Sequence, residues 1–150
     1  ALALARKRGI PRILDINLRP PFFDDALIRD SVAACSVLKL SDEELDRVAE
    51  ACAIPSSESE LERIKMIREK FGLHWVVMTQ GAEGATLVLE RGSARQPGVP
   101  AKVVDTVGAG DSFTAALTIG LLEQNDPSDI LETACQLAAE VCSHAGAVPQ

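Results

Sequence analysis

Short apolar runs alternate along the chain with segments in which apolar residues recur at helical spacing. The runs are brief and rich in branched aliphatic residues, which is typical of buried strands. Between them, apolar residues return every three or four positions, which is typical of amphipathic helices. The pattern predicts strands at 12–18, 36–40, 74–79 and 85–90, and helices at 1–8, 24–35, 41–53, 57–71, 108–123 and 126–144.

Several of the predicted helices carry terminal signals. Ser41 and Ser57 are each followed three residues later by a glutamate, which forms the capping box that satisfies free amides at a helix start. Asp126 precedes Pro127, whose fixed φ suits the first helical position. Gly9 follows the first helix as a C-cap. These signals set the expected boundaries of the helices.

The order of these elements predicts an α/β fold. Strands that alternate with helices form a mostly parallel sheet. A hairpin after Thr79 is expected to add an antiparallel edge. Residues 94–104 are expected to form short edge strands, broken by Pro97 and Pro100. A chain of 150 residues is long enough for one domain with its own core.

Charge and composition argue against several classes of function. The net charge is −7, and acidic and basic residues are interspersed, which argues against a nucleic-acid partner. No stretch reaches the roughly 20 apolar residues of a membrane-spanning helix, and the first nine residues lack the order of a signal peptide. The four cysteines lack Cys-x-x-Cys spacing and are expected to be core residues in a reducing compartment. We therefore expect a cytoplasmic protein without a membrane partner.

The strongest candidate for chemistry is the run from Val104 to Phe113. A strand end is expected to lead through residues 108–110, Gly-Ala-Gly, into a helix. Glycines let the backbone approach a ligand, and first-turn amides favour an anion because they have no partner within the helix. Asp111 lies in that turn, where a carboxylate can accept the proton of an attacking hydroxyl. The alternative is a tight turn in which Asp111 only complements the helix dipole.

Residues 105–113 resemble the C-terminal signature of the PfkB family of carbohydrate kinases, Asp-Thr-x-Gly-Ala-Gly-Asp-x-Phe. The sequence has neither a Walker A lysine nor a Gly-x-Gly-x-x-Gly run, so it fits neither a P-loop nor a Rossmann site. The resemblance implies that Asp111 is the catalytic base for a sugar hydroxyl. It also implies that the amides of Gly108, Ala109 and Gly110 form an anion hole for the transferring phosphoryl group.

A second candidate segment contains Asp15, Asn17 and Arg19. In a strand these three positions share one face, at the carboxyl end where ligands bind in open α/β sheets. Residues 15–20 resemble the Asp-x-Asn-x-Arg-Pro run of fructokinases and 2-keto-3-deoxygluconate kinases of this family, which lies along the substrate and phosphate cleft. Arg19 is then expected to neutralise phosphate or to bind the carboxylate of an acidic sugar. A solvated polar strand end is the alternative.

Glu44 is the candidate for a metal-associated residue. The resemblance places it at the glutamate of the family's Asn-x-x-Glu motif, which is tied to magnesium and phosphate. Ser41 replaces the asparagine, a departure that fructokinase-like members share. A carboxylate there is expected to act on Mg²⁺ mainly through water. The alternative is that Glu44 only completes the capping box with Ser41.

Two further segments resemble nucleotide-binding parts of the family. The turn that contains Thr79, Gly81 and Gly84 is similar to the Thr-x-Gly-x-x-Gly turn that lines the nucleotide. Near the C-terminus, His144 and Gly146 fall in a stretch similar to the Gly-Ala ending that borders the adenine pocket. The alternatives are a plain β-turn and a histidine that favours a helix C-terminus.

The resemblance implies a ribokinase-like three-layer αβα fold with a mostly parallel sheet. Family members are about twice this length, so residues 1–150 are expected to be the C-terminal, nucleotide-binding and catalytic-base half, with the lid absent. The implied function is ATP- and Mg²⁺-dependent phosphorylation of a sugar, fructokinase-like, with 2-keto-3-deoxygluconate kinase and ribokinase as alternatives. The resemblance implies a homodimer for the full-length protein, because the lid of family members is often the dimer contact. A catalytically silent nucleotide-binding fragment is the alternative of another class.

Overall fold

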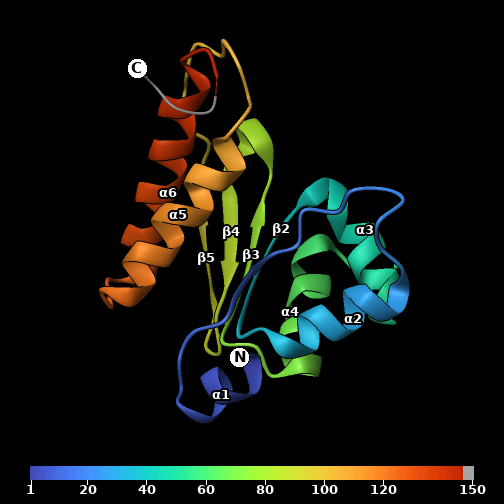
Figure 1. Cartoon of the computed structure of the whole chain (residues 1–150). Helices are drawn as coiled ribbons and strands as arrows, with labels where there is room; N and C mark the ends of the chain where they lie inside the picture. The colour runs from blue at the N-terminus through green and yellow to red at the C-terminus, as the bar shows by residue number, and fades with distance from the viewer. Residues whose placement is uncertain (147–150) are drawn as a thin grey trace. The chain divides into compact units, whose positions relative to one another are not determined.

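The computed structural model describes residues 1–146 and divides the chain into two compact units (Figure 1). Unit 1 consists of residues 1–79 and 88–93. Unit 2 consists of residues 80–87 and the described part of 94–150. Each unit has its own packing and its own candidate site residues.

Unit 1 is built on three parallel strands in the order β1-β2-β3. The register pairs Leu14 with Leu38 and Leu38 with Val76, so β2 is the central strand of the three. This confirms the predicted parallel arrangement. The elements of unit 1 are α1 (Leu2–Lys7), β1 (Ile13–Asp15), α2 (Asp25–Ala34), β2 (Val37–Ser41), α3 (Asp42–Ala51), α4 (Glu60–Phe71) and β3 (Trp75–Thr79).

One face of these strands forms the core of unit 1. Alternate residues of β2, Leu38 and Leu40, are fully buried there. Ile28 of α2 and Ile64 of α4 belong to the same apolar cluster. Because successive strand residues point to opposite faces, Lys39 projects from the face opposite Leu38 and Leu40. The face that carries Lys39 is also buried, since Val37 and Val77 lie on it and are at most 1% exposed, so the charge of Lys39 is set among apolar residues.

The predicted start of one helix changes. Helix α4 begins at Glu60 with Ser59 as its N-cap, whose hydroxyl accepts a hydrogen bond from the Glu62 amide; the predicted cap at Ser57 is wrong. Both serines are followed by a glutamate three residues later, so the sequence motif does not distinguish them. The capping box of α3 at Ser41 is confirmed.

The predicted strand at 12–18 is too long. Strand β1 ends at Asp15, and Asn17 has a φ of 39°, in the left-handed region. The side chains at positions 15, 17 and 19 therefore do not share one face as expected, because a left-handed residue interrupts the extended backbone.

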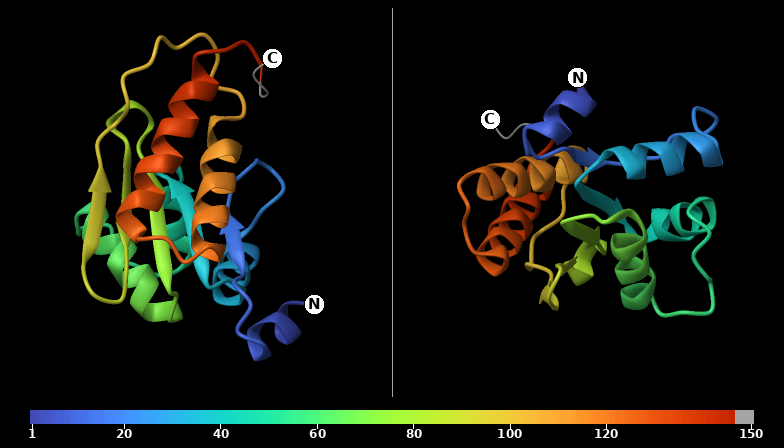
Figure 2. Two further views of the ribbon diagram at one scale, coloured as in Figure 1. Left: turned by 90° about the vertical axis from the view of Figure 1, so that its left-hand side faces the viewer. Right: turned by 90° about the horizontal axis from the view of Figure 1, so that it is seen from below.

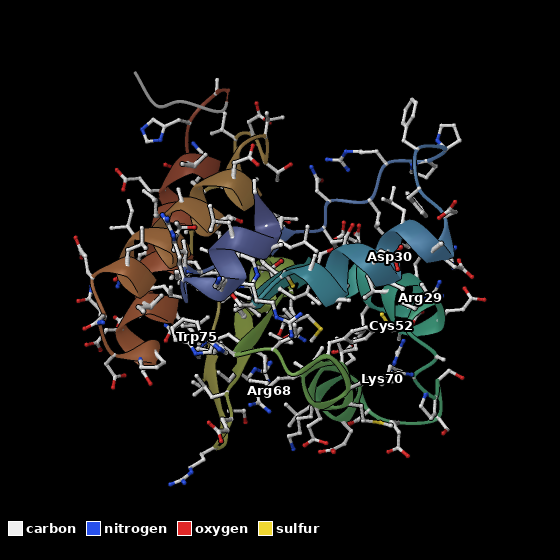
Figure 3. The ribbon with its side chains drawn as sticks, turned by 60° about the horizontal axis from the view of Figure 1, so that its bottom comes forward. Arg29, Asp30, Cys52, Arg68, Lys70 and Trp75 are labelled. Carbon is white, nitrogen blue, oxygen red and sulfur yellow. The ribbon has the colours of Figure 1, made fainter. Side chains whose placement is uncertain are left out.

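Lys70 of α4 donates from Nζ to the Cys52 carbonyl oxygen at 2.8 Å and so caps the end of α3 (Figure 3).

Unit 2 contains the 3₁₀ turn η1 (Gly81–Glu83), most of β4 (Ala85–Val88) and β5 (Ser93–Gln96), and the helices α5 (Ala109–Leu122) and α6 (Pro127–Cys142). Strands β4 and β5 are neighbours, as the predicted hairpin requires. The expected strands at 94–104 reduce to the end of β5, because Pro97 and Pro100 cannot donate to a ladder. Asp126 and Pro127 start α6 as predicted.

Helices α5 and α6 lie side by side and cross closely (Figure 2). A methyl group added at Gly120 of α5 would approach Ile130 Cγ1 of α6 to 2.6 Å, so a larger residue would force the helices apart. None of the helices in residues 1–146 is long and apolar enough to cross a membrane.

Candidate functional site

The glycine-rich run of unit 2 forms the start of α5, as the sequence predicts. Gly108 is the N-cap, with φ 84° and ψ −7°, a left-handed conformation that strains any residue with a Cβ. This turn directs the chain from the preceding loop into the helix. Among the described residues, the amides of Gly110 and Asp111 have no hydrogen-bond acceptor. Two free donors at the positive end of a helix dipole have the chemistry to bind an anion.

Asp111 is the third residue of α5 and is exposed. Within residues 1–146, its carboxylate has no hydrogen-bond donor and no ion-pair partner. A carboxylate in that state can accept a proton without first breaking an internal contact. Asp111 therefore meets the local geometric requirement for a base that works beside a bound anion.

Asp105 is a residue whose role the sequence reasoning missed. Its Oδ1 accepts from the Val107 amide and its Oδ2 from the Gly146 amide, each at 3.0 Å. Its own amide donates to the Cys142 carbonyl oxygen at the end of α6. The hydrogen bonds from Val107 and then Gly146 hold the pKa of the Asp105 carboxyl below its ordinary value. Asp105 thus ties the glycine-rich turn to the segment that follows α6.

His144 and Gly146 have different surroundings. Gly146, with φ 79°, donates to Asp105 and so joins the loop that precedes α5. His144 is exposed, and its Nδ1 lies 2.9 Å from the Glu140 carbonyl oxygen. This contact agrees with the alternative of a histidine at a helix C-terminus. Ala147, the last residue of the resembling stretch, lies outside the described residues.

The Gly81–Gly84 turn is constrained by packing within unit 2. A Cβ at Gly84, where φ is 99°, would lie 2.0 Å from the Gln96 carbonyl oxygen. A Cβ at Gly98 would lie 1.8 Å from the Ala82 carbonyl oxygen. The two glycines therefore let this turn and the segment after β5 make direct backbone contact. Thr79 ends β3 in unit 1, and its hydroxyl donates to the Leu40 carbonyl oxygen at 3.4 Å.

Unit 1 carries a polar cavity of about 380 Å³ beyond the carboxyl ends of β1 and β2. Four of the five predicted site residues of unit 1 line it, and Thr79 does not; positions 15, 17 and 19 do not share a strand face as expected. They are brought together because the chain turns at Asn17 directly above the start of α3. The four residues are Asp15, Asn17, Arg19 and Glu44.

Glu44 is held by three hydrogen bonds. Its Oε2 accepts from the amide and the hydroxyl of Ser41, at 2.9 and 3.0 Å. Its Oε1 accepts from the Leu18 amide at 2.7 Å. Glu44 therefore completes the capping box and also fastens the 16–19 loop to α3. One direction at Oε1 is left for a further ligand, which is compatible with an outer contact to hydrated Mg²⁺.

Lys39 is a second residue that the sequence reasoning missed. It lies in the middle of β2 and is only 6% exposed. Its Nζ lies 3.2 Å from both carboxylate oxygens of Asp15, its register partner on β1. The signal was a lysine between Leu38 and Leu40, because a charged residue inside an apolar strand needs a buried partner.

The other cations of the cavity differ in how they are bound. Arg47 forms ion pairs with Asp25 and Glu50, and its guanidinium lies 5.8 Å from the centre of the Phe23 ring. Arg19 is exposed, and its guanidinium has no partner in the described part of the chain. No group of three His, Cys, Asp or Glu side chains within residues 1–146 has the spacing of a metal site. A divalent ion would therefore need oxygen atoms of a bound substrate or of water, in addition to side chains of this chain.

Comparison with known proteins matches the whole sequence to one family. The model of the pfkB family of carbohydrate kinases matches residues 1–150. A fructokinase of Klebsiella pneumoniae is 30% identical over 148 residues, which cover 95% of this chain and 46% of that protein. A fructosamine kinase of Bacillus subtilis is 36% identical over 91 residues, 61% of this chain and 32% of that protein.

Solved structures agree with these relatives. A fructokinase double mutant of Vibrio cholerae, with fructose, ADP and potassium bound, superimposes with a TM-score of 0.83 at 26% identity, over 98% of this chain and 49% of that one. A nucleoside kinase of Burkholderia thailandensis in complex with inosine gives a TM-score of 0.81 at 25% identity, over 97% and 45%. The ribokinase-like fold predicted from the sequence is thereby confirmed. The chain spans about half the length of these proteins, or less.

Proposed function

This chain belongs to the pfkB family of carbohydrate kinases, and we propose that it serves the transfer of the γ-phosphoryl group of ATP to a hydroxyl of a sugar. The observation that carries the proposal is the start of α5. There, an unpartnered Asp111 carboxylate lies one residue from the free Gly110 amide. A base beside an anion-binding position is the arrangement that phosphoryl transfer to an alcohol requires.

In the proposed reaction, Asp111 accepts the proton of the sugar hydroxyl while that oxygen attacks the γ-phosphorus. The new O–P bond forms as the bond from phosphorus to the β,γ-bridging oxygen breaks, which leaves ADP and the sugar phosphate. The free amides of the first turn, including that of Gly110, donate to the transferring phosphoryl group as charge shifts onto its oxygens. The left-handed turn at Gly108 starts the helix that carries these amides.

Magnesium and nucleotide fit the residues present. Mg²⁺ bound to ATP neutralises phosphate charge, and hard oxygen ligands suit this ion. Glu44 offers the remaining direction at Oε1, which suits a contact through water and not a direct cage. Gly146 is proposed to border the nucleotide because Asp105 binds it to the loop before α5. Thr79, Gly81 and Gly84 are proposed to line the nucleotide, and His144 to face the base.

For the sugar, we propose a ketose of the fructokinase type. Two fructokinases that are at least 30% identical over most of this chain support that choice. Arg19, with its free guanidinium at the mouth of the unit 1 cavity, also suits a carboxylate, so a 2-keto-3-deoxy sugar acid is the second candidate within the class. Ribokinases and nucleoside kinases among the relatives make ribose the third.

We propose that residues 1–150 are the nucleotide-binding and catalytic-base half of the kinase domain. The coverage of less than half of the fructokinases of Klebsiella pneumoniae and Rhizobium leguminosarum favours this assignment. The same observation supports a second candidate of another class, in which the 150-residue chain binds nucleotide but does not turn over.

The test measures sugar-stimulated ADP release with a panel of fructose, 2-keto-3-deoxygluconate and ribose. The whole protein in which this sequence occurs is expected to turn over one of them, and Asp111→Ala is expected to remove that turnover. If no sugar stimulates ADP release, the kinase proposal fails. If the 150-residue chain alone binds ATP without turnover, the second candidate describes that chain.

A further inference from the structure

Lys39 is a buried cation with one donor to spare. Its side chain is 8% exposed and lines the unit 1 cavity. An ammonium group has three N–H donors, and the contacts of Lys39 with the two Asp15 oxygens use two of them. Among the described residues, Lys39 Nζ has no other acceptor. A nine-tenths buried ammonium with an open donor in a cavity points to a ligand with an acceptor atom.

Stability alone does not explain this pair. Removing two charges from water costs about as much as their attraction returns, and an apolar residue of the same length often serves a buried position equally well. Lys39 has apolar neighbours in its own strand, Leu38 and Leu40, and methionine would match its length there. A lysine–aspartate pair at this place therefore calls for a role beyond folding.

Most of the hydrogen-bond donors of the cavity that lack an acceptor are cationic. Both oxygens of Glu44 already accept hydrogen bonds, and Arg47 is engaged by Asp25 and Glu50. This leaves Lys39, the guanidinium of Arg19 and the neutral side-chain amide of Asn17 as donors without a full set of acceptors among the described residues. Glu43 is the one lining carboxylate outside these contacts, and it is exposed to solvent, where water screens its charge. The donors of the cavity that lack an acceptor therefore favour an oxyanion as the ligand.

We propose that Lys39 is an oxyanion-binding residue, which donates its remaining N–H to a phosphate oxygen of the nucleotide while Asp15 orients the ammonium. Asp15 acts through Lys39 and is a positioning residue. Only the identity of the anion rests on the proposed kinase function. The existence of an oxyanion site rests on the burial and the contacts of Lys39.

The test compares anion binding in three variants of the whole protein, by titration calorimetry with inorganic pyrophosphate and with a non-hydrolysable ATP analogue. Lys39→Met is expected to weaken binding of both probes by about ten- to a hundredfold, the range of a charge-assisted hydrogen bond. Asp15→Asn keeps an acceptor for the ammonium and removes a negative charge, so it is expected to bind pyrophosphate at least as tightly as the wild type. The double variant Asp15→Asn/Lys39→Met carries no buried charge and separates folding from binding. It is expected to regain stability but not affinity.

Lys70→Met is the matched control. Lys70 is an exposed lysine of unit 1 whose Nζ donates to the backbone carbonyl oxygens of Cys52 and Ala53 at the end of α3, away from the cavity lining (Figure 3). Its loss is expected to lower stability and to leave the dissociation constant of pyrophosphate within twofold.

Two results would overturn the inference. One is an unchanged affinity of Lys39→Met for both probes. The other is a double variant that regains stability and affinity together, because the pair would then be structural. A failure of the kinase proposal alone gives a different result. The wild-type protein would then show no sugar-dependent turnover, while Lys39→Met would still weaken its binding of pyrophosphate.

Discussion

Replacing Gly108 with alanine tests the left-handed start of α5. Gly108 has a φ of 84°, which costs an L-residue about 1–2 kcal/mol relative to glycine. For a chain of this size, that loss corresponds to a fall in melting temperature of about 2–8 °C. The strain also shifts the first turn, so the dissociation constant for ATP is expected to rise.

Gly110 provides the matched substitution. It lies inside the first turn of α5 and is not among the glycines with positive φ. Gly110→Ala is therefore expected to raise the free energy of unfolding by up to about 1 kcal/mol, from helix propensity. Its methyl group is still expected to weaken ATP binding, because it crowds the approach to the free amides. The two variants should change stability in opposite directions and affinity in the same direction.

The assay is urea unfolding followed by circular dichroism, together with ATP titration of each folded variant. If Gly108→Ala proves as stable as Gly110→Ala, the helix does not begin at a left-handed residue. If both variants bind ATP as the wild type does, the amides of this turn do not contact the nucleotide.

Four further substitutions test other contacts. Asp105→Asn is expected to make the free energy of unfolding depend less on pH in the acid range. The folded-state pKa of Asp105 lies below its ordinary value of about 3.9, so the stabilisation by its carboxylate is present above that value and is lost as pH falls through the folded pKa. Ser59→Ala is expected to lower the free energy of unfolding by about 1 kcal/mol and Ser57→Ala by less than about 0.5, because only Ser59 caps α4; equal losses would contradict this boundary. Glu44→Gln is expected to destabilise α3 by about 0.5–2 kcal/mol and to raise the Mg²⁺ concentration needed for half-maximal turnover; an unchanged Mg²⁺ requirement would remove Glu44 from the metal environment.

Local signals in the sequence predicted the elements that depend on local physics. The start of helix α5 could be predicted because a glycine-rich run followed by apolar residues at helical spacing is typical of a helix start. The cap of α6 followed from Asp126 and Pro127 for the same reason. The end of β1 could not be placed, because the left-handed turn at Asn17 occurs in a residue type that also tolerates extended backbone.

Contacts between distant residues were the part that sequence reasoning missed. The bond from Gly146 to Asp105 spans 41 positions, and the Lys39–Asp15 pair joins two strands 24 positions apart. Neither follows from spacing, since both depend on which strands and loops become neighbours. The lysine inside an apolar strand was the one available signal, and it indicates that a partner is needed without identifying which residue supplies it.

The central claim is that Asp111 is the base, and Asp111→Asn tests it most directly, because the amide keeps the shape of the side chain and loses its basicity. Rapid-quench measurement of the phosphoryl-transfer step in the whole protein, with saturating ATP and the preferred sugar, is expected to show a rate about 10²–10⁴-fold below that of the wild type, with the dissociation constant for ATP changed less than about threefold. A transfer rate within tenfold of the wild type, at unchanged ATP affinity, would contradict the assignment of Asp111.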